Sequence, residues 1–404
     1  MVGIFPLSTL LIILVSTYTW RRLRIVRLDS IRERVIWTFW TWLWDYPVPL
    51  DINQWQLSNP EDTELYGKEA RTILRTWKFL GPFFASRGYT LYQSQPSRIF
   101  DLLPAPVTKS AKIRADPKFP YARRAYIHDD EMLFGFESLR VWPARDEAGR
   151  DVVIRLVSGR DPSDELKFLQ RLNTEQARAD PRNHSICILD YISFDGLVFA
   201  VMPRWDQSFN HNFHTVAELV YFTETFLEGF DFLHELRIAH TDFLEQNTGI
   251  NVLVDTRGTF LTGLRDTSVT RYAIYDFGGS LIYPEDTILE NAQTDEFLNF
   301  RLRGYETPPG PWNPFQVDIL FLGCILERWV RHIEDIVPEI GPFFDLMVTN
   351  DLSKRFTARQ ALQEFRRIHE QLSTSQLDSL VTNRFWDNGV ISTKGQRPTR
   401  LRAW

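Results

Sequence analysis

The spacing of apolar residues changes at Pro203, and this change limits the folds that the chain can adopt. Before Pro203, short runs such as "DVVIRLV" and "LVFAVMP" have the length and β-branched content of strands. After it, apolar residues recur at helical spacing from Leu219 to Leu233, behind a capping-box pair formed by Thr215 and Glu218. The sequence therefore predicts an α+β fold, with a small β-rich lobe, a larger helical lobe and a cleft between them.

Composition and charge exclude several classes of protein. The 404 residues correspond to about two to three domain-sized units, and 44% of them are hydrophobic, enough to form cores. The net charge of -6 gives no general positive field, so no nucleic acid is expected as a partner. Cys187 and Cys324 are the only cysteines, which suits a reducing compartment and predicts neither a disulfide framework nor a thiolate metal site.

The N-terminal segment has the pattern of a membrane anchor. Residues 2–20 carry no charge and would span roughly 28 Å as a helix, and Arg21, Arg22, Arg24 and Arg27 follow. By the positive-inside rule, the expectation is a single-pass membrane protein whose remaining chain is cytosolic. A cleaved signal peptide and an ordinary buried start are the alternatives, and with the latter the protein would be soluble and cytoplasmic.

A second N-terminal region separates this anchor from the strands. Residues 30–46 contain four tryptophans and predict a helix, either at a membrane interface or packed on a domain. Prolines then predict an extended linker or strap over residues 94–124. The expected organisation is an anchor with its basic flank (1–27), an extension (28–124), a β-rich lobe (125–203), a helical lobe (204–372) and a tail (373–404).

Two motifs after the first long helix carry candidate chemistry. "AHTDFLEQN" contains His240, Asp242 and Asn247, and "YDFGG" contains Asp276, about 30 residues later. Together they resemble the catalytic loop and the magnesium loop of the protein kinase family. The resemblance extends to Asp318 and Arg355 of the helical lobe, covers most of residues 126–365, and is closest to divergent kinase-like proteins of mushroom-forming fungi. It implies the bilobal protein kinase fold, an α+β fold to which the uncharged run at residues 2–20 adds an N-terminal transmembrane helix.

The resemblance also implies a role for each matched residue. Asp242, next to His240, would orient the acceptor hydroxyl and accept its proton, while Asn247 and Asp276 would bind Mg²⁺. Asn251 is the alternative to Asn247, because the following "VLVD" is similar to the strand that follows the magnesium asparagine in the family.

ATP is the expected cofactor together with Mg²⁺, and the resemblance assigns five residues to its binding. Arg155 takes the position of the strand lysine, and Glu165 is the preferred partner of that cation, with Glu175 as the alternative. The other three are Val141, Val153 and Met202, of which Val153 would lie over the adenine.

The sequence departs from the family where the phosphates should be held. Side chains replace the three glycines of the phosphate loop in "FGFESLRV", and an arginine is not equivalent to a lysine. Thr241, Leu244 and Pro309 replace three further family residues, and Pro309 leaves Arg355 without its usual glutamate. Two functions therefore remain open: a membrane-tethered kinase acting on protein Ser or Thr, or a pseudokinase that serves as a nucleotide-binding or protein-interaction scaffold. A small-molecule phosphotransferase is less favoured.

An insertion separates the two motifs. Residues 255–272 are rich in Gly, Thr and Asp, which predicts an exposed, mobile turn that is dispensable for folding.

Overall fold

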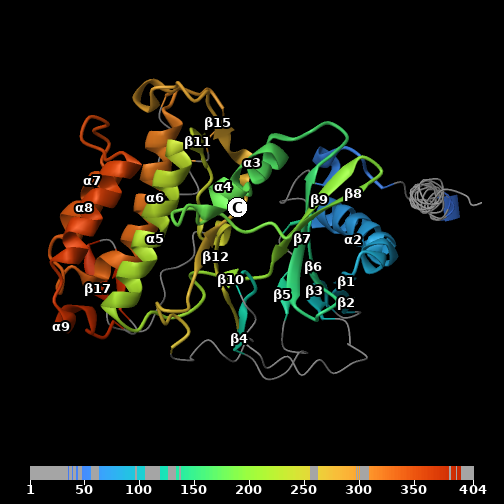
Figure 1. The fold of residues 1–404 in the computed structure, drawn as a ribbon, viewed down its shortest axis with the longest axis horizontal. Helices are drawn as coiled ribbons and strands as arrows, with labels where there is room; N and C mark the ends of the chain where they lie inside the picture. Colours follow the sequence, from blue (N-terminus) through green and yellow to red (C-terminus); the bar gives the residue numbers. More distant parts are fainter. Residues whose placement is uncertain are drawn as a thin grey trace, which may run out of the picture. The chain divides into compact units, whose positions relative to one another are not determined.

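In the computed structural model of the chain, the strand-like runs before Pro203 form one curled antiparallel sheet with the order β1-β6-β7-β9-β8 (Figure 1). Its central strand, β7, is buried along almost its whole length, as expected for a continuous apolar run. The strands of this sheet are β1 (Thr90–Leu91), β6 (Val141–Arg145), β7 (Asp151–Ser158), β8 (Asp190–Phe194) and β9 (Leu197–Pro203).

The structure describes most of the chain, in several ranges. These are residues 48–55, 63–95, 98–104, 119–125, 133–135, 138–254, 263–296, 298, 300, 309–381, 384–387 and 389–392, together with 35, 39, 42 and 43. The chain divides into two units, Met1–Pro49 and Leu50–Trp404. The large sheet and the long helices all belong to the second unit.

A long amphipathic helix from the N-terminal extension packs against the sheet. This helix is α2 (Thr63–Ser86), and its Trp77 is fully buried. The Trp77 ring stacks on Trp142 of β6 at 5.5 Å between centroids and meets Phe199 of β9 edge-on at 5.8 Å. Its Nε1 donates a hydrogen bond to the carbonyl of Leu139 at 2.9 Å. Part of the predicted extension is therefore integral to the sheet core.

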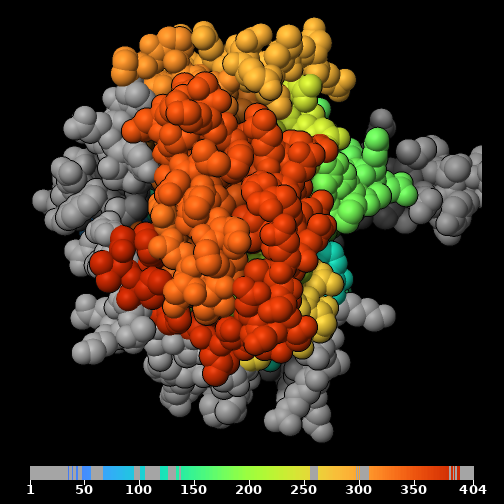
Figure 2. Space-filling model, turned by 90° about the vertical axis from the view of Figure 1, so that its left-hand side faces the viewer, coloured from blue at the N-terminus to red at the C-terminus, as the bar shows by residue number. Residues whose placement is uncertain are grey.

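The helices after Pro203 pack side by side and form the larger part of the core (Figure 1). They are α5 (Val216–Glu235), α6 (Pro314–Val330), α7 (Ile340–Val348), α8 (Ala358–Glu370) and α9 (Thr374–Leu377). Helix α5 begins where its capping residue predicts, since Thr215 Oγ1 accepts a hydrogen bond from the Glu218 amide at 3.3 Å. The face in Figure 2 consists largely of the orange and red C-terminal helices.

Several short strands and helices supplement the large sheet and the long helices, and one of them, β16, packs against α6. The strands form the small sheets β10-β12-β14, β11-β15, β13-β4, β2-β3-β5 and β16-β17. Their bounds are β2 (Gln93–Gln95), β3 (Arg98–Leu103), β4 (Arg123–Ala125), β5 (Phe134–Gly135), β10 (Asp206–Gln207), β11 (Ile238–Ala239), β12 (Thr248–Ile250), β13 (Val252–Val254), β14 (Tyr272–Ile274), β15 (Leu281–Ile282), β16 (Phe385–Asp387) and β17 (Val390–Ser392). The short helices are α3 (Asp164–Leu172) and α4 (Glu175–Ala179).

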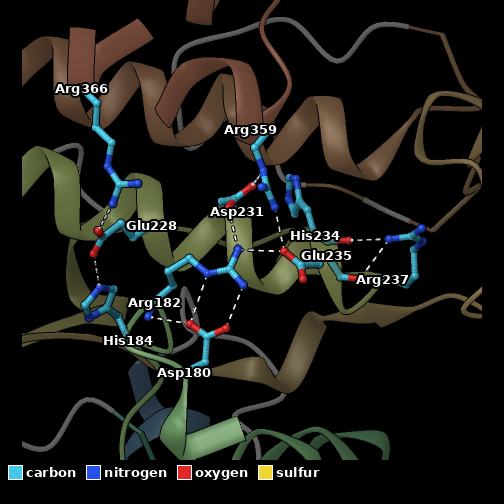
Figure 3. A network of polar contacts seen from close by, with 10 residues as sticks. All are labelled: Asp180, Arg182, His184, Glu228, Asp231, His234, Glu235, Arg237, Arg359 and Arg366. Atoms are coloured by element: carbon cyan, nitrogen blue, oxygen red, sulfur yellow. Dashed lines mark hydrogen bonds and ion pairs between the residues drawn. The ribbon is translucent and has the colours of Figure 1, made fainter. Parts of the chain in front are cut away.

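An ion-pair network ties the segment after α4 to the long helices (Figure 3). Arg182 contacts Asp231 and Glu235 of α5 at 2.9 and 2.7 Å. Arg359 of α8 reaches the same two carboxylates at 2.6 and 2.7 Å. Asp231 is buried, and an unpaired carboxylate would be costly there. Arg182 and Arg359 compensate its charge.

The expected fold class, a kinase fold with an N-terminal transmembrane helix, requires correction. The structure is a mixed α/β protein with a curled sheet, and no helix among the described residues is long and apolar enough to cross a membrane. A span needs about 20 predominantly apolar residues, whereas α2 carries charged side chains as far as Lys78 and α5 carries them throughout its length. Residues 2–20, on which the expectation rested, and most of residues 30–46 lie outside the described residues.

The described part of the insertion, residues 263–272, is exposed at residues 263, 266–269 and 271, as predicted, but Leu264, Arg265, Thr270 and Tyr272 are buried. Arg265 is fully buried there, with its guanidinium 3.7 Å from the centroid of the Phe213 ring. It donates hydrogen bonds to Tyr272 Oη at 2.9 Å and to the carbonyls of Ser208 and His211. The turn-like composition of residues 255–272 gave no indication that Arg265 would be buried and would hold the insertion in place. Residues 255–262 lie outside the described residues.

Candidate functional site

A buried carboxylate holds the loop that follows β11. Asp318, from the first half of α6, is completely buried. Its two oxygens accept hydrogen bonds from the backbone amides of His240 and Thr241 at 2.8 and 2.7 Å. Thr241 has a left-handed backbone with φ of 64°, and its hydroxyl donates to the carbonyl of Gly279 at 2.6 Å. Residues 240–247 therefore have a fixed backbone, supported by α6 and by the segment after Asp276.

The His240 ring links the two predicted motifs. Its Nε2 lies 3.0 Å from the carbonyl oxygen of Tyr275, the residue before Asp276. Its Nδ1 lies 3.3 Å from the Asp242 amide, which can only donate. This pair of contacts selects the neutral tautomer that carries its proton on Nε2. His240 is fully buried, so it positions the loops.

Asp242 and Asn247 lie together, and Asn251 lies elsewhere. The Asn247 Nδ2 donates to the carbonyl of Asp242 at 2.7 Å and approaches its Oδ2 at 3.3 Å. Asn251 instead accepts from the Arg271 amide at 2.8 Å and donates to the Val269 carbonyl at 3.0 Å. Asn251 thus closes the base of the insertion, and of the two asparagines only Asn247 borders Asp242. Leu244 directly precedes the short 3₁₀ turn Glu245–Asn247 that carries Asn247, and its side chain makes no capping hydrogen bond.

Four charged side chains meet between α3, β7 and the Asp276 loop. The Arg155 Nε donates to Glu165 Oε1 at 2.5 Å, and its Nη2 is ion-paired with Asp276 Oδ1. The other oxygen of Glu165 binds Arg140 Nη1 at 3.1 Å. Glu165 can reach Arg155 because α3 begins at Asp164, where Ser163 caps the helix. Glu175 lies in α4.

The group of four is charge-balanced. The two guanidinium groups of Arg140 and Arg155 face the two carboxylates of Glu165 and Asp276. Burial opposes ionisation of Asp276, but Arg155 and then Arg140 more than offset it, so the pKa of this carboxyl is below its usual range. Burial likewise opposes the charge of Arg155, and Asp276 and Glu165 raise its pKa despite it. Both partners are thus ionised at neutral pH.

Sequence reasoning missed Arg140. It lies in the turn before β6, where the resemblance aligns a phosphate-binding loop. A Cβ on Gly278 would lie 3.3 Å from Arg140 Nη2 and 3.5 Å from Arg155 Nη2, so both guanidinium groups border the glycine that follows Phe277. No local pattern marks a single arginine in a turn, so only the tertiary contacts assign it to this site.

The segment aligned with the phosphate-binding loop has a different course. Phe134 and Gly135 form β5, which pairs with Asp101 and Leu102 of β3. The outer neighbour of β6 is instead β1, residues 90–91. The chain therefore leaves the large sheet after β1 and returns to it at Val141, and the two strands do not form a simple hairpin around the site.

The residues assigned to adenine binding line the apolar side of the site. Val153 of β7 and Met202 of β9 are paired across the sheet. Met202 is buried with Ile186 and Ala273, and Val153, Trp205 and Tyr275 pack against this cluster. Val141 begins β6 and pairs with Arg155. The sheet thus connects the apolar residues to the charged ones.

The two predicted magnesium ligands, Asp276 and Asn247, are each engaged by other groups of the protein. Mg²⁺ prefers near-octahedral oxygen ligands, commonly one or two carboxylates together with phosphate oxygens. Asp276 already carries the guanidinium of Arg155, and no group of three His, Cys, Asp or Glu among the described residues could hold a metal ion. Asn247 is buried, and its Nδ2 is bound to Asp242.

Arg355, the last matched residue, binds backbone carbonyls. Its Nε donates to the Thr349 carbonyl at 3.0 Å and its Nη1 to the Gln316 carbonyl at 3.2 Å. These contacts join the turn before α8 to α6. Residues 301–308, which include most of the aligned activation-segment end, lie outside the described residues.

Comparison with known proteins does not assign the chain to a family. No protein-family model matches the chain, and no curated protein sequence matches it.

Proposed function

We propose that the chain is a kinase-like binding protein, a pseudokinase whose phosphate-handling site is closed by its own ion pairs. It would act as a scaffold for a protein partner. The observation that carries this proposal is the ion pair between Arg155 and Asp276, the carboxylate that the resemblance assigns to magnesium. Arg155 is also paired with Glu165, the partner that the resemblance predicts, and Arg140 binds the other oxygen of Glu165.

The charge balance of the group supports a binding role over transfer. A nucleotide triphosphate brings several negative charges, and a kinase neutralises them with a lysine and with magnesium held by a carboxylate. Here the corresponding carboxylate, Asp276, is paired with a guanidinium, so phosphate binding requires this ion pair to open first. Separating a largely buried pair leaves its charges uncompensated, which is costly.

The second candidate is a protein kinase that transfers the γ-phosphate of ATP, with Mg²⁺, to protein Ser or Thr. The adjacency of Asp242 and Asn247 favours it, because an acceptor-orienting carboxylate and a magnesium ligand would need this proximity. The side chain of Asp276 is 36% exposed, so a competing ion could approach it from solvent.

The test is phosphate transfer and ATP binding by the full-length chain, with Asp242→Asn defining the background. We expect no transfer to the protein itself or to a generic Ser/Thr acceptor above the Asp242→Asn level. We also expect no Mg²⁺-dependent shift in thermal unfolding with millimolar ATP. A ligand at about 100 times its Kd would stabilise the fold by about 2.7 kcal/mol, which such a scan detects.

Transfer by the wild-type chain that Asp242→Asn removes would refute the proposal and establish the kinase alternative. A Mg²⁺-dependent stabilisation by ATP without transfer would refute only the claim that the site is closed. The protein would then be a scaffold that binds nucleotide.

A further inference from the structure

A polar cavity of about 240 Å³ lies among the helices that follow Pro203. It is lined by the C-terminal end of α5, by the first turns of α6 and α8, and by Leu289 and Glu290. The residues predicted for catalysis, nucleotide binding and magnesium binding are not among those that line it. Cofactor-sized ligands usually occupy about 300–1,000 Å³, so this cavity suits a single side chain.

The segment after β15 forms one wall of the cavity and is held in place by α6. Asn313, the N-cap of α6, donates from its Nδ2 to the carbonyls of Leu289 and Glu290 at 2.7 and 3.1 Å. The Leu289 side chain also packs against the buried cluster that contains Phe315 of α6. The cavity therefore offers an apolar surface, formed by Leu289 and Phe315, to the methylene groups of a long side chain.

The two arginines that line the cavity are already bound by groups of the protein (Figure 3). Arg359 is ion-paired with Asp231 and Glu235 at 2.6 and 2.7 Å. Arg237 donates hydrogen bonds to the carbonyls of Glu235 and Thr287, both at 2.9 Å. An anionic ligand would have to compete with these partners.

Glu290 is the carboxylate of the cavity that remains available to a ligand. It is exposed, and its side chain has no hydrogen-bond or ion-pair partner among the described residues. Asp231 and Glu235, in contrast, are each paired with two arginines. The group left open in the cavity is therefore an anion, which favours a cationic ligand.

The surface around Glu290 carries the same sign of charge. Residues 283–296 contain neither lysine nor arginine but five exposed carboxylates, on Glu285, Asp286, Glu290, Asp295 and Glu296. Ile282 and Ile288 accompany them with exposed fractions of 46% and 61%. Such a surface is complementary to a basic protein segment that also carries apolar side chains, and it disfavours nucleic acid and anionic lipid.

We propose that the cavity and residues 283–296 form a docking site for a basic segment of a partner protein. One arginine of the partner enters the cavity, packs its methylene groups on Leu289 and Phe315, and pairs its guanidinium with Glu290. Arginine is preferred to lysine because its planar guanidinium can donate two hydrogen bonds to one carboxylate. The inference rests on the proposed scaffold role, for which it names the chemistry of the partner.

The probe is a fluorescein-labelled peptide of four Arg-Gly repeats, whose binding to the full-length chain is measured by fluorescence anisotropy. Glu290→Gln removes the open charge of the cavity and should weaken binding at least about fivefold. Glu285→Gln is the matched control: this side chain is 91% exposed and does not line the cavity, so a loss of less than about twofold is expected. A peptide of Lys-Gly repeats should bind wild type more weakly than the Arg-Gly peptide does.

Because Glu290 is exposed, its substitution should leave the fold intact, and thermal unfolding checks this. The docking site is refuted if wild type does not bind the Arg-Gly peptide, or if Glu290→Gln and Glu285→Gln weaken binding equally. Displacement of the peptide by arginine amide at the same concentration as by unlabelled peptide would also refute it, because the ligand would then be a small cation.

These outcomes are separate from the transfer assay. Phosphate transfer by the wild-type chain would refute the proposed scaffold role whatever the peptide affinities are. Failure of the peptide to bind would refute the docking site and leave the ion pair between Arg155 and Asp276 unaffected.

Discussion

At the scale of single residues, the most constrained side chain of the site is Glu165. It is one carboxylate with a guanidinium on each oxygen, Arg155 at 2.5 Å and Arg140 at 3.1 Å, and its side chain is only 4% exposed. A surface carboxylate would gain little from such pairing, but a buried one is required to compensate the cations around it. Loss of the Glu165 charge should therefore lower the free energy of unfolding, whether or not the site has an activity.

Glu165→Gln should destabilise the protein by about 3 kcal/mol, because two mostly buried arginines lose a shared counter-charge while the shape is unchanged. Urea unfolding followed by circular dichroism measures this. The neighbouring Asp164→Asn is the control: Asp164 is 71% exposed and pairs with the exposed Lys167, so a change of less than about 1 kcal/mol is expected. Equal effects of the two substitutions would contradict the buried cluster.

At the scale of elements, the start of α3 and the contacts at the base of the insertion fix where their side chains lie. Ser163 starts α3 directly before the first turn that contains Glu165, and this compensates for the short spacing from Arg155. The described part of the insertion is held at its base by Asn251 and from within by Arg265. The inserted residues thus brace the strands β12 and β14 that flank them.

Arg265→Ala should lower the free energy of unfolding by about 3 kcal/mol, since it leaves the Ser208 and His211 carbonyls without this donor and opens space beside Phe213. Arg271→Ala is the matched control, because Arg271 lies on the same insertion and is exposed; about 0.5 kcal/mol or less is expected. Chemical denaturation of both variants checks this. A neutral Arg265→Ala would restore the view of the insertion as dispensable.

At the scale of the whole molecule, the stability of the Leu50–Trp404 unit should depend on pH through a buried histidine. His332 is 3% exposed, and its Nδ1 has no hydrogen-bond partner within the described part of the chain. Burial first, and then the nearby charge of Arg384, lower its pKa to about 4. The unfolded chain therefore binds the proton more tightly than the fold does, at a pKa of about 6.5.

Stability should therefore be full above a pH of about 6.5 and fall as the pH is lowered towards about 4, by about 3 kcal/mol over that window. Urea unfolding at intervals across this window measures the slope. His332→Gln, which cannot take up a proton, should show a much flatter dependence in the upper part of the window, where carboxyl groups do not yet titrate. An identical slope in both proteins would assign the effect to other groups.

Local patterns were sufficient for much of the fold. The strand β7, the helix α5 with its Thr215 cap, and the loop that brings His240 and Asp242 together all follow from spacing that is visible over a few turns or strands. The choice between Asn247 and Asn251 remained open in the sequence, because the spacing from Asp242 favours Asn247 whereas the strand-like run after Asn251 favours Asn251. The structure distinguishes them by their contacts, since Asn247 binds Asp242 and Asn251 binds the backbone of Arg271.

The sequence by itself thus determined the strand β7, the helix α5 and the grouping of His240 with Asp242, because backbone preference and apolar periodicity are local properties. It did not mark α2 as a helix. Only the tertiary structure decided that Arg140 joins Glu165, that the hydroxyl end of the Tyr275 ring lies against Gly249, and that Trp77 of the extension completes the sheet core. These contacts join residues that are 25, 26 and 65 positions apart in the sequence. Close packing selects such partners by shape and charge once the chain has collapsed, and no short-range pattern encodes them.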